Sequence, residues 1–127
     1  MGKGKYKHEE LTKRIIGAFY TVYNELGYGF LEKVYEKALV IELNDMGLSA
    51  IAQVPIDVKY KGNTIGEYFA DIVVNNMVIV EIKATEEFHE KHTLQLINYL
   101  KATDIEVGLL LNFGEEPQVV RKIFSNK

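Results

Sequence analysis

Residues 69–84 read FADIVVNNMVIVEIKA, and this stretch decides the fold. Two runs rich in Val and Ile, over 64–74 and 77–83, flank the pair Asn75-Asn76. Asparagine tolerates positive φ and therefore marks a tight turn. The stretch predicts two antiparallel strands joined by a short loop.

The strand over 77–83 carries charged side chains where a buried strand normally carries apolar ones. Because side chains alternate along a strand, Glu81 and Lys83 share one face, and Val78, Val80 and Ile82 share the other. Asp71 interrupts the neighbouring strand in the same way. Buried carboxylates are costly unless they are paired, hydrogen-bonded or bound to a metal.

Two interpretations of these charges stay open on the residues alone. Lys83 can form a structural ion pair with Glu81 or with Asp71. Alternatively, the two carboxylates offer oxygen ligands to Mg²⁺, a hard cation that keeps several waters and completes its shell with substrate phosphate. A lysine beside such a cation can orient the attacking water or stabilise charge on a phosphoryl oxygen.

The register between the two strands tests the second interpretation. Residues directly opposite each other in an antiparallel pair point to the same face. A two-residue turn at 75–76 would set Asp71 opposite Val80, on the wrong face from Glu81. A joint site therefore predicts a three-residue loop over 75–77, or a bulge near Asp71.

Outside this hairpin, apolar periodicity predicts the remaining elements. Helices are expected over 9–26, 31–45 and 86–101, and strands over 53–60, 106–113 and 118–124. Thr85 is the expected N-cap of the third helix. The strand over 106–113 is apolar enough to be buried on both faces, and the last strand suits a sheet edge. The order ααβββαββ predicts an α/β (α+β mixed) fold with a mixed central sheet flanked by helices.

Composition limits the class of protein. The chain has 127 residues with 47% hydrophobic and 26% charged residues, which suits one globular domain over 1–127 with a flexible N-terminus over 1–8. The absence of cysteine excludes disulfides, Cys-type zinc sites and thiol nucleophiles. A net charge of −3 argues against a lysine-coated binder of polyanions. No apolar run is long enough for a bilayer and no secretory signal is present, so a cytoplasmic protein without membrane contact is expected.

A second motif extends the pattern. Residues 29–35, GFLEKVY, read as Gly29-x-x-Glu32-x-x-Tyr35. Together with YFADIVV, VIVEIKA and QLINYLKATDIEVGLLLNFG, this motif makes the chain resemble the GxxExxY family of the PD-(D/E)xK nuclease superfamily, which is RecB-like. Ala70 stands where the superfamily name has proline.

The resemblance implies a restriction-endonuclease-like core and roles for particular residues. Asp71 and Glu81 match the metal-binding acids and Lys83 the catalytic lysine, so these three are the expected catalytic residues. The further metal ligands and the supporting or substrate-contacting residues that it implies are Glu32, the carbonyl of Ile82, Gln95, Tyr99 and Tyr35. The implied cofactor is Mg²⁺ or Mn²⁺, and the implied partner is nucleic acid, with DNA favoured. Because the chain has the length of a minimal catalytic core, target selection is expected to need a homodimer or a separate partner.

Each supporting residue also has a plainer interpretation. Glu32 lies in the first turn of a helix, where the dipole favours any carboxylate. Gln95 and Tyr99 lie four apart on one helical face and suit a core edge. His89 and His92 lack the spacing of the HExxH zinc motif and suit structural or exposed positions, although His92 shares a face with Gln95 and could touch DNA.

The leading hypothesis is a Mg²⁺-dependent nuclease that hydrolyses phosphodiester bonds of nucleic acid in repair, recombination or defence. The alternative is a catalytically silent nucleic-acid-binding or assembly module on the same fold.

Overall fold

A computed structural model of the chain describes residues 7–87 and 89–125. The predicted order of elements is confirmed: α1 (Glu9–Leu26), α2 (Glu32–Asp45), β1 (Ala50–Tyr60), β2 (Asn63–Val74), β3 (Val78–Lys83), α3 (Glu90–Lys101), β4 (Val107–Phe113) and β5 (Pro117–Ile123). Across the part of the chain so described, no helix is both long and apolar enough to cross a membrane.

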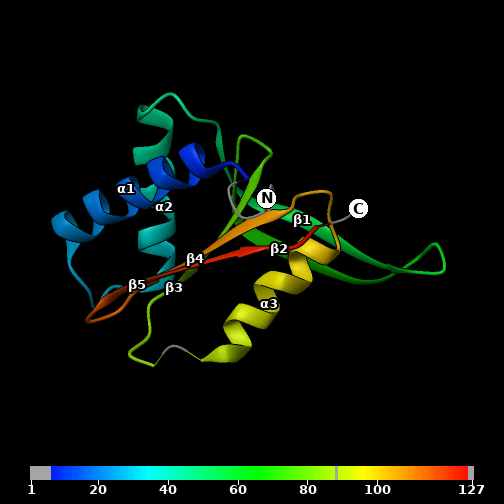
Figure 1. Cartoon of the computed structure of the whole chain (residues 1–127). Coiled ribbons are helices and arrows are strands. Elements are labelled where there is room, and N and C mark those ends of the chain that lie inside the picture. The colour runs from blue at the N-terminus through cyan, green and yellow to red at the C-terminus, as the bar shows by residue number, and fades with distance from the viewer. Residues whose placement is uncertain (1–6, 88, 126–127) are drawn as a thin grey trace.

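The strands form one mixed sheet in the order β1-β2-β3-β4-β5. The pair of β3 and β4 is parallel, because α3 carries the chain across the sheet between them, and the other three pairs of this sheet are antiparallel. Helices α1 and α2 cover one face of the sheet and α3 covers the other (Figure 1). All seven residues of β4 are buried, as the aliphatic sequence predicted, and β5 lies at the edge.

The loop between β2 and β3 has the predicted odd length. Val74 pairs with Val78 and Ile72 with Val80, so residues 75–77 form a three-residue connection. Asn75 and Asn76 take φ values of 52° and 54°, the left-handed conformation that asparagine tolerates. Continued by one residue, this register places Asp71 opposite Glu81, so both side chains lie on the same face of the sheet.

The prediction that Thr85 caps the third helix is wrong. That helix begins at Glu90, after His89, and has no side-chain cap. The reason is a long-range contact: buried Asn112 accepts a hydrogen bond from the Thr85 N–H at 3.0 Å and donates one to the Thr85 carbonyl at 2.8 Å. The chain that leaves β3 is thereby held beside β4 instead of starting a helix.

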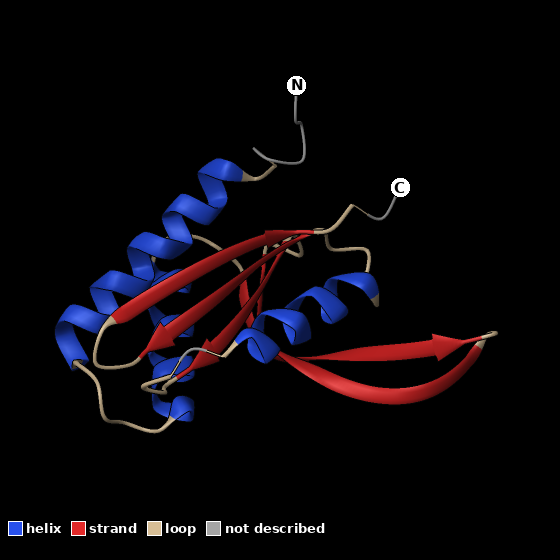
Figure 2. Ribbon diagram, turned by 60° about the horizontal axis from the view of Figure 1, so that its bottom comes forward, coloured by secondary structure: helices blue, strands red, loops and turns tan. Residues whose placement is uncertain are grey.

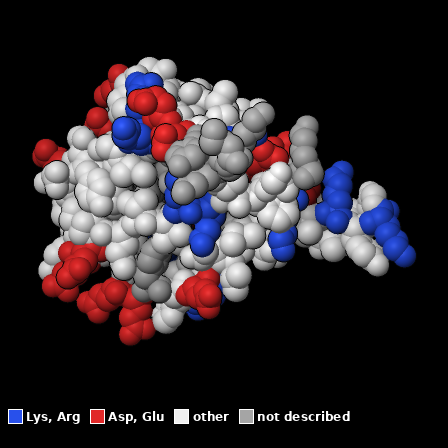
Figure 3. Space-filling model, viewed as in Figure 1, with Lys and Arg blue, Asp and Glu red and all other residues white. Residues whose placement is uncertain are grey.

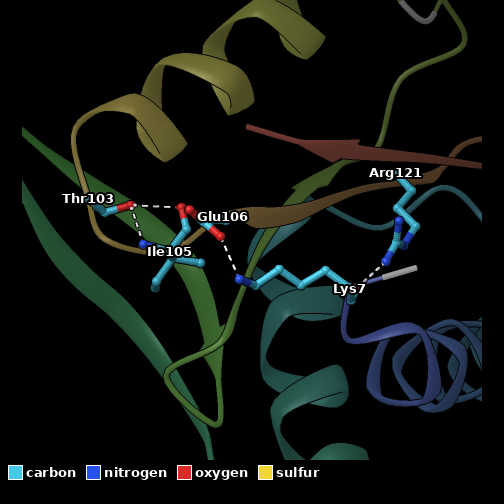
Figure 4. Close-up of polar contacts among 5 residues, drawn as sticks. All are labelled: Lys7, Thr103, Ile105, Glu106 and Arg121. Atoms are coloured by element: carbon cyan, nitrogen blue, oxygen red, sulfur yellow. Dashed lines mark hydrogen bonds and ion pairs between the residues drawn. The ribbon is translucent and has the colours of Figure 1, made fainter. Parts of the chain in front are cut away.

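The segment that leads into α1 is bound to the end of the sheet at which β4 begins and β5 ends (Figure 4). Lys7 Nζ lies 2.6 Å from Glu106 Oε1, and the Lys7 carbonyl accepts a hydrogen bond from Arg121. The loop after α3 closes close by, where Thr103 Oγ1 accepts the Ile105 N–H at 3.3 Å. The expected flexible N-terminus over 1–8 therefore includes an anchored Lys7, while residues 1–6 lie outside the described residues.

The Gly and Tyr of the GxxExxY motif build the turn between α1 and α2. Gly29 has a φ of 111°, which L side chains rarely adopt. The Tyr35 hydroxyl donates to the Gly27 carbonyl at 2.8 Å and accepts the Phe30 N–H at 3.1 Å. The Tyr35 ring is fully buried and stacks on Phe113 at 4.3 Å. The buried Tyr35 side chain thus holds the turn through these two hydrogen bonds, and α2 begins at Glu32 directly after the turn.

This geometry predicts opposite effects for two glycine substitutions. Gly29→Ala should lower the free energy of unfolding by roughly 1–3 kcal/mol, because alanine is strained at this φ. Gly17→Ala in α1, where an added Cβ meets nothing within 4 Å, should raise it by about 0.4–1 kcal/mol. Urea unfolding measures both values, and a matching loss in the two variants would contradict this account of the turn.

Candidate functional site

The site lies where β2 and β3 separate. Their backbone pairing ends at Ile72 and Val80, one residue short of Asp71 and Glu81. Beyond this point β2 continues with β1 as a hairpin that projects from the sheet (Figure 2). Two neighbouring strands that diverge leave main-chain donors in need of partners.

The two carboxylates supply these partners across the fork. Glu81 Oε2 accepts the main-chain N–H of Asp71 at 2.8 Å, and Asp71 Oδ2 accepts the main-chain N–H of Ile82, also at 2.8 Å. The side chain of Glu81 is thereby held by the backbone of β2, and the side chain of Asp71 is held by the backbone of β3. The reciprocal bonds fix both side chains at one point, as the joint site required.

The second oxygen of each acid is available to a ligand. Among the described residues, neither Asp71 Oδ1 nor Glu81 Oε1 has a hydrogen bond within the protein. In the described part of the chain, one fully buried side-chain N or O atom has no hydrogen-bond partner, and that atom is His92 Nδ1. The free carboxylate oxygens are therefore not sealed in the core, although Glu81 as a residue is only 4% exposed.

Lys83 stands beside both acids without being bound to either. Within the described ranges, no ion pair at 4 Å or less joins its ammonium to Asp71 or Glu81. The interpretation as a closed structural ion pair is therefore wrong. The positive charge of Lys83 is still close enough to lower the pKa of both carboxyl groups.

Burial dominates the protonation of the two acids. Burial and the charge of Asp71 raise the pKa of Glu81 to about 8, against the smaller lowering effects of the Asp71 N–H and Lys83. Burial also raises the pKa of Asp71, and the nearby charges of Glu36 and Glu32 act in the same direction. The fork therefore holds carboxyl groups whose ionisation is opposed by burial and by one another, an effect that Lys83 only partly offsets.

Glu36 is a site residue that the sequence analysis missed. It is 6% exposed, and its Oε1 accepts a hydrogen bond from Gln53 Nε2 at 2.8 Å. Its Oε2 lies 3.2 Å from Lys33 Nζ. Glu36 follows Glu32 by one helical turn, and this spacing was the available signal. Glu32 itself is exposed on the first turn of α2.

Gln53, which holds Glu36, is a second residue near the site that the sequence did not predict. It takes a positive φ of 56° within β1, between the pairs of Ala52 with Ile72 and Val54 with Ala70. This position is level with Asp71 in the register of the two strands. The backbone irregularity therefore falls directly beside the fork, where it turns a side-chain amide toward Glu36.

Tyr99 of α3 lies near the acids, and Gln95 precedes it by one helical turn. Tyr99 is buried, and burial together with the charges of Glu81 and Asp71 raises the pKa of its hydroxyl to about 12. The Tyr99 ring lies 5.8 Å from that of Tyr68 on β2. Both α3 residues line a groove of about 870 Å³ between α3 and the projecting hairpin.

His92 faces the same region from the first turn of α3. Its pKa is lowered by burial and by the positive charge of Lys83. The His89 ring lies 5.9 Å away, and His89 itself contacts Glu87 at 3.3 Å. His92 is thus half-buried beside Lys83, while Tyr35 lies under the α1–α2 turn with its hydroxyl fully engaged.

The donor set fits a hard divalent cation with few protein ligands. Across the described residues, no group of three or more His, Cys, Asp or Glu side chains is spaced to hold a metal ion. The fork offers one free oxygen from each of two carboxylates, and the main chain of Ile82 lies against Asp71. Mg²⁺ suits such a site, because it binds through one or two carboxylates and retains water.

Comparisons with known proteins agree with this geometry. A family model described as "PD-(D/E)XK nuclease superfamily" matches residues 9–123. A crystal structure of a protein called SSO0001 has the same fold, with a TM-score of 0.54 and 19% identity over 94% of this chain. This chain spans only 61% of that protein. No curated protein matches the sequence significantly. The mixed sheet and its helices form a restriction-endonuclease-like fold, and the chain belongs to the PD-(D/E)XK nuclease superfamily.

Proposed function

We propose that this protein is a metal-dependent nuclease of the GxxExxY family that hydrolyses phosphodiester bonds, with DNA as its substrate. The observation that carries the proposal is the meeting of Asp71 and Glu81 at the fork, each fixed by the other's strand, beside a Lys83 that forms no ion pair with them within residues 7–87 and 89–125. A purely structural pair of acids would gain from an ion pair with Lys83, which the described residues do not form.

In this proposal, Asp71 and Glu81 hold Mg²⁺ or Mn²⁺ through their free oxygens. The carbonyl of Ile82 and the exposed carboxylate of Glu32 complete the protein's share of the ligands, with water and substrate phosphate filling the rest. When bound, the cation would neutralise charge on the phosphate and lower the pKa of a bound water. Glu36 adds negative charge to the site and is held by Gln53.

Lys83 has the other principal role. Its ammonium is free to orient the attacking water and to stabilise the charge that develops on phosphoryl oxygens during in-line attack. Gln95 contacts the phosphate from α3, and Tyr99 steadies the acids from the same helix. Tyr35 supports the site indirectly, because it fixes the turn that precedes Glu32. A role in repair, recombination or defence, a cytoplasmic location and a homodimer stay predictions.

Cleavage assays test the catalytic proposal. With Mg²⁺ or Mn²⁺, the protein should cut at least one member of a panel of linear, branched and single-stranded DNAs, and EDTA should stop the reaction. Lys83→Ala should reduce the rate by about 10²–10³-fold, because it removes one charge-stabilising group. Lys37→Ala, on an exposed position of α2, is the matched control and should leave the rate unchanged. Metal-independent cutting, or no cutting of any substrate, contradicts the proposal.

Metal binding provides a test that does not depend on the substrate. Titration with Mn²⁺ in a calorimeter should give a binding signal that Asp71→Asn abolishes, since the amide keeps an acceptor for the Ile82 N–H but loses the charge. Asp104→Asn, in the exposed loop after α3, should bind as the wild type does. A silent module on this fold predicts no signal in any of the three proteins.

The charge at the fork predicts a pH effect on stability in EDTA. Burial raises the pKa of Glu81 from 4.5 to about 8, so between these pH values the folded protein keeps a proton that the unfolded chain has released. The free energy of unfolding should therefore fall as pH rises through this window. Chemical unfolding at pH 5 and pH 8 should show a smaller fall for Glu81→Gln, which retains an acceptor for the Asp71 N–H. Glu25→Gln, at an exposed position of α1, should behave as the wild type; equal slopes in all three proteins would refute this assignment.

A further inference from the structure

The groove beside the acids has features that the hydrolytic site does not explain. It has a volume of about 870 Å³ and lies between α3 and the part of the β1–β2 hairpin that projects from the sheet (Figure 2). A volume of this size is typical of pockets that enclose small organic molecules. None of Asp71, Glu81 and Lys83 lines it.

Aromatic and apolar side chains form its walls. Tyr68 of β2 is 48% exposed, and its ring lies 5.8 Å from that of Tyr99. Leu94 of α3 and Ile65 of β2 also line the groove and are exposed. An exposed tyrosine in a concave setting offers a flat face to another planar group.

The charge of the groove is opposite to that of the whole chain. Its charged lining residues are three lysines and one aspartate: Lys59, Lys91, Lys101 and Asp57. The chain as a whole carries a net charge of −3. Figure 3 shows Lys side chains on the projecting hairpin, whereas several Asp and Glu side chains gather toward the other end of the molecule. The groove therefore favours a polyanion over a neutral or cationic ligand.

Tyr99 links the groove to the candidate catalytic site. Gln95 and Tyr99 line it, and the hydroxyl of Tyr99 lies within the electrostatic reach of Glu81 and Asp71. Tyr99 therefore belongs to the wall of the groove and lies near both acids of the fork.

We propose that this groove binds a single-stranded segment of nucleic acid, with a base stacked on Tyr68 and the phosphates beside Lys59, Lys91 and Lys101. The inference rests on the proposed nuclease function and names the form of its substrate. Stacking on aromatic rings requires an unpaired base, because a duplex hides the faces of its bases. A positively charged groove with aromatic side chains is the usual means of holding such a strand.

Binding measured in EDTA tests this inference apart from cleavage. Fluorescein-labelled dT12, rU12 and a 12-base-pair DNA duplex would be titrated with the protein and followed by fluorescence anisotropy. At least one single strand should bind more tightly than the duplex. Tyr68→Ala should weaken that binding about tenfold through the loss of a stacked base. Tyr60→Ala is the control, because Tyr60 is a tyrosine of the hairpin that is 60% exposed and does not line the groove.

The lysines give an independent measurement. Lys91→Ala and Lys101→Ala should each reduce the slope of log affinity against log salt concentration by about 0.7, as expected for one lost phosphate contact on a single strand. Lys37→Ala should leave the slope unchanged. Tighter binding of the duplex, or equal effects of Tyr68→Ala and Tyr60→Ala, would overturn the groove assignment.

The two proposals fail separately. Tyrosine-dependent binding of a single strand without metal-dependent cleavage would remove the nuclease proposal and leave the groove. Metal-dependent cleavage that is sensitive to Lys83→Ala but accompanied by unchanged binding in Tyr68→Ala would remove the groove and leave the nuclease.

Discussion

The structure depends on two reciprocal hydrogen bonds, from Asp71 N–H to Glu81 and from Ile82 N–H to Asp71. They replace backbone pairing at the point where β2 leaves β3, so the sheet can split there without leaving these two donors unpaired. The split has two consequences. It brings two carboxylates together at an opening of the sheet, and it lets β1 and β2 project as an arm (Figure 2). The candidate site and the groove beside it therefore share one origin in the backbone.

This arrangement has an energetic cost that a purely structural element would avoid. Glu81 is nearly buried beside Asp71, and burial together with that neighbouring charge raises its pKa to about 8. Lys83 lowers the pKa of both acids but forms no ion pair with them in the described part of the chain. Apolar residues of similar size would pack here without unbalanced charge. Retaining the charges makes sense where a cation and a phosphate arrive to balance them, which is the physical basis of the proposed function.

The sequence predicted the features that depend on local apolar periodicity and on which face of a strand each side chain occupies. The element order and the buried strand over 107–113 follow from apolar periodicity, and the odd loop over 75–77 follows from the requirement that Asp71 and Glu81 share one face. The sequence-based prediction was wrong or incomplete where a contact with a residue distant in the sequence determines the local structure. Asn112 holds Thr85 from 27 residues away, so the apparent N-cap signal at Thr85 is overridden. Glu36 was missed because a charge on a helix normally faces water, whereas here Gln53 of β1 and Lys33 of α2 each hold one oxygen of the buried carboxylate.

The helix α3 connects the two functions assigned to this face. Tyr99 packs toward the acids and also lines the groove, while Lys91 and Lys101 lie near the two ends of the same helix. Because the chain is negative overall, long-range attraction does not bring a polyanion to it. In the proposed function, recognition would therefore depend on short-range contacts: lysines that hold the phosphates, a tyrosine that holds a base, and a cation at the fork that neutralises the phosphate next to it. Because each of these proposed contacts would be weak alone, the three would have to act together to hold a strand at the acids.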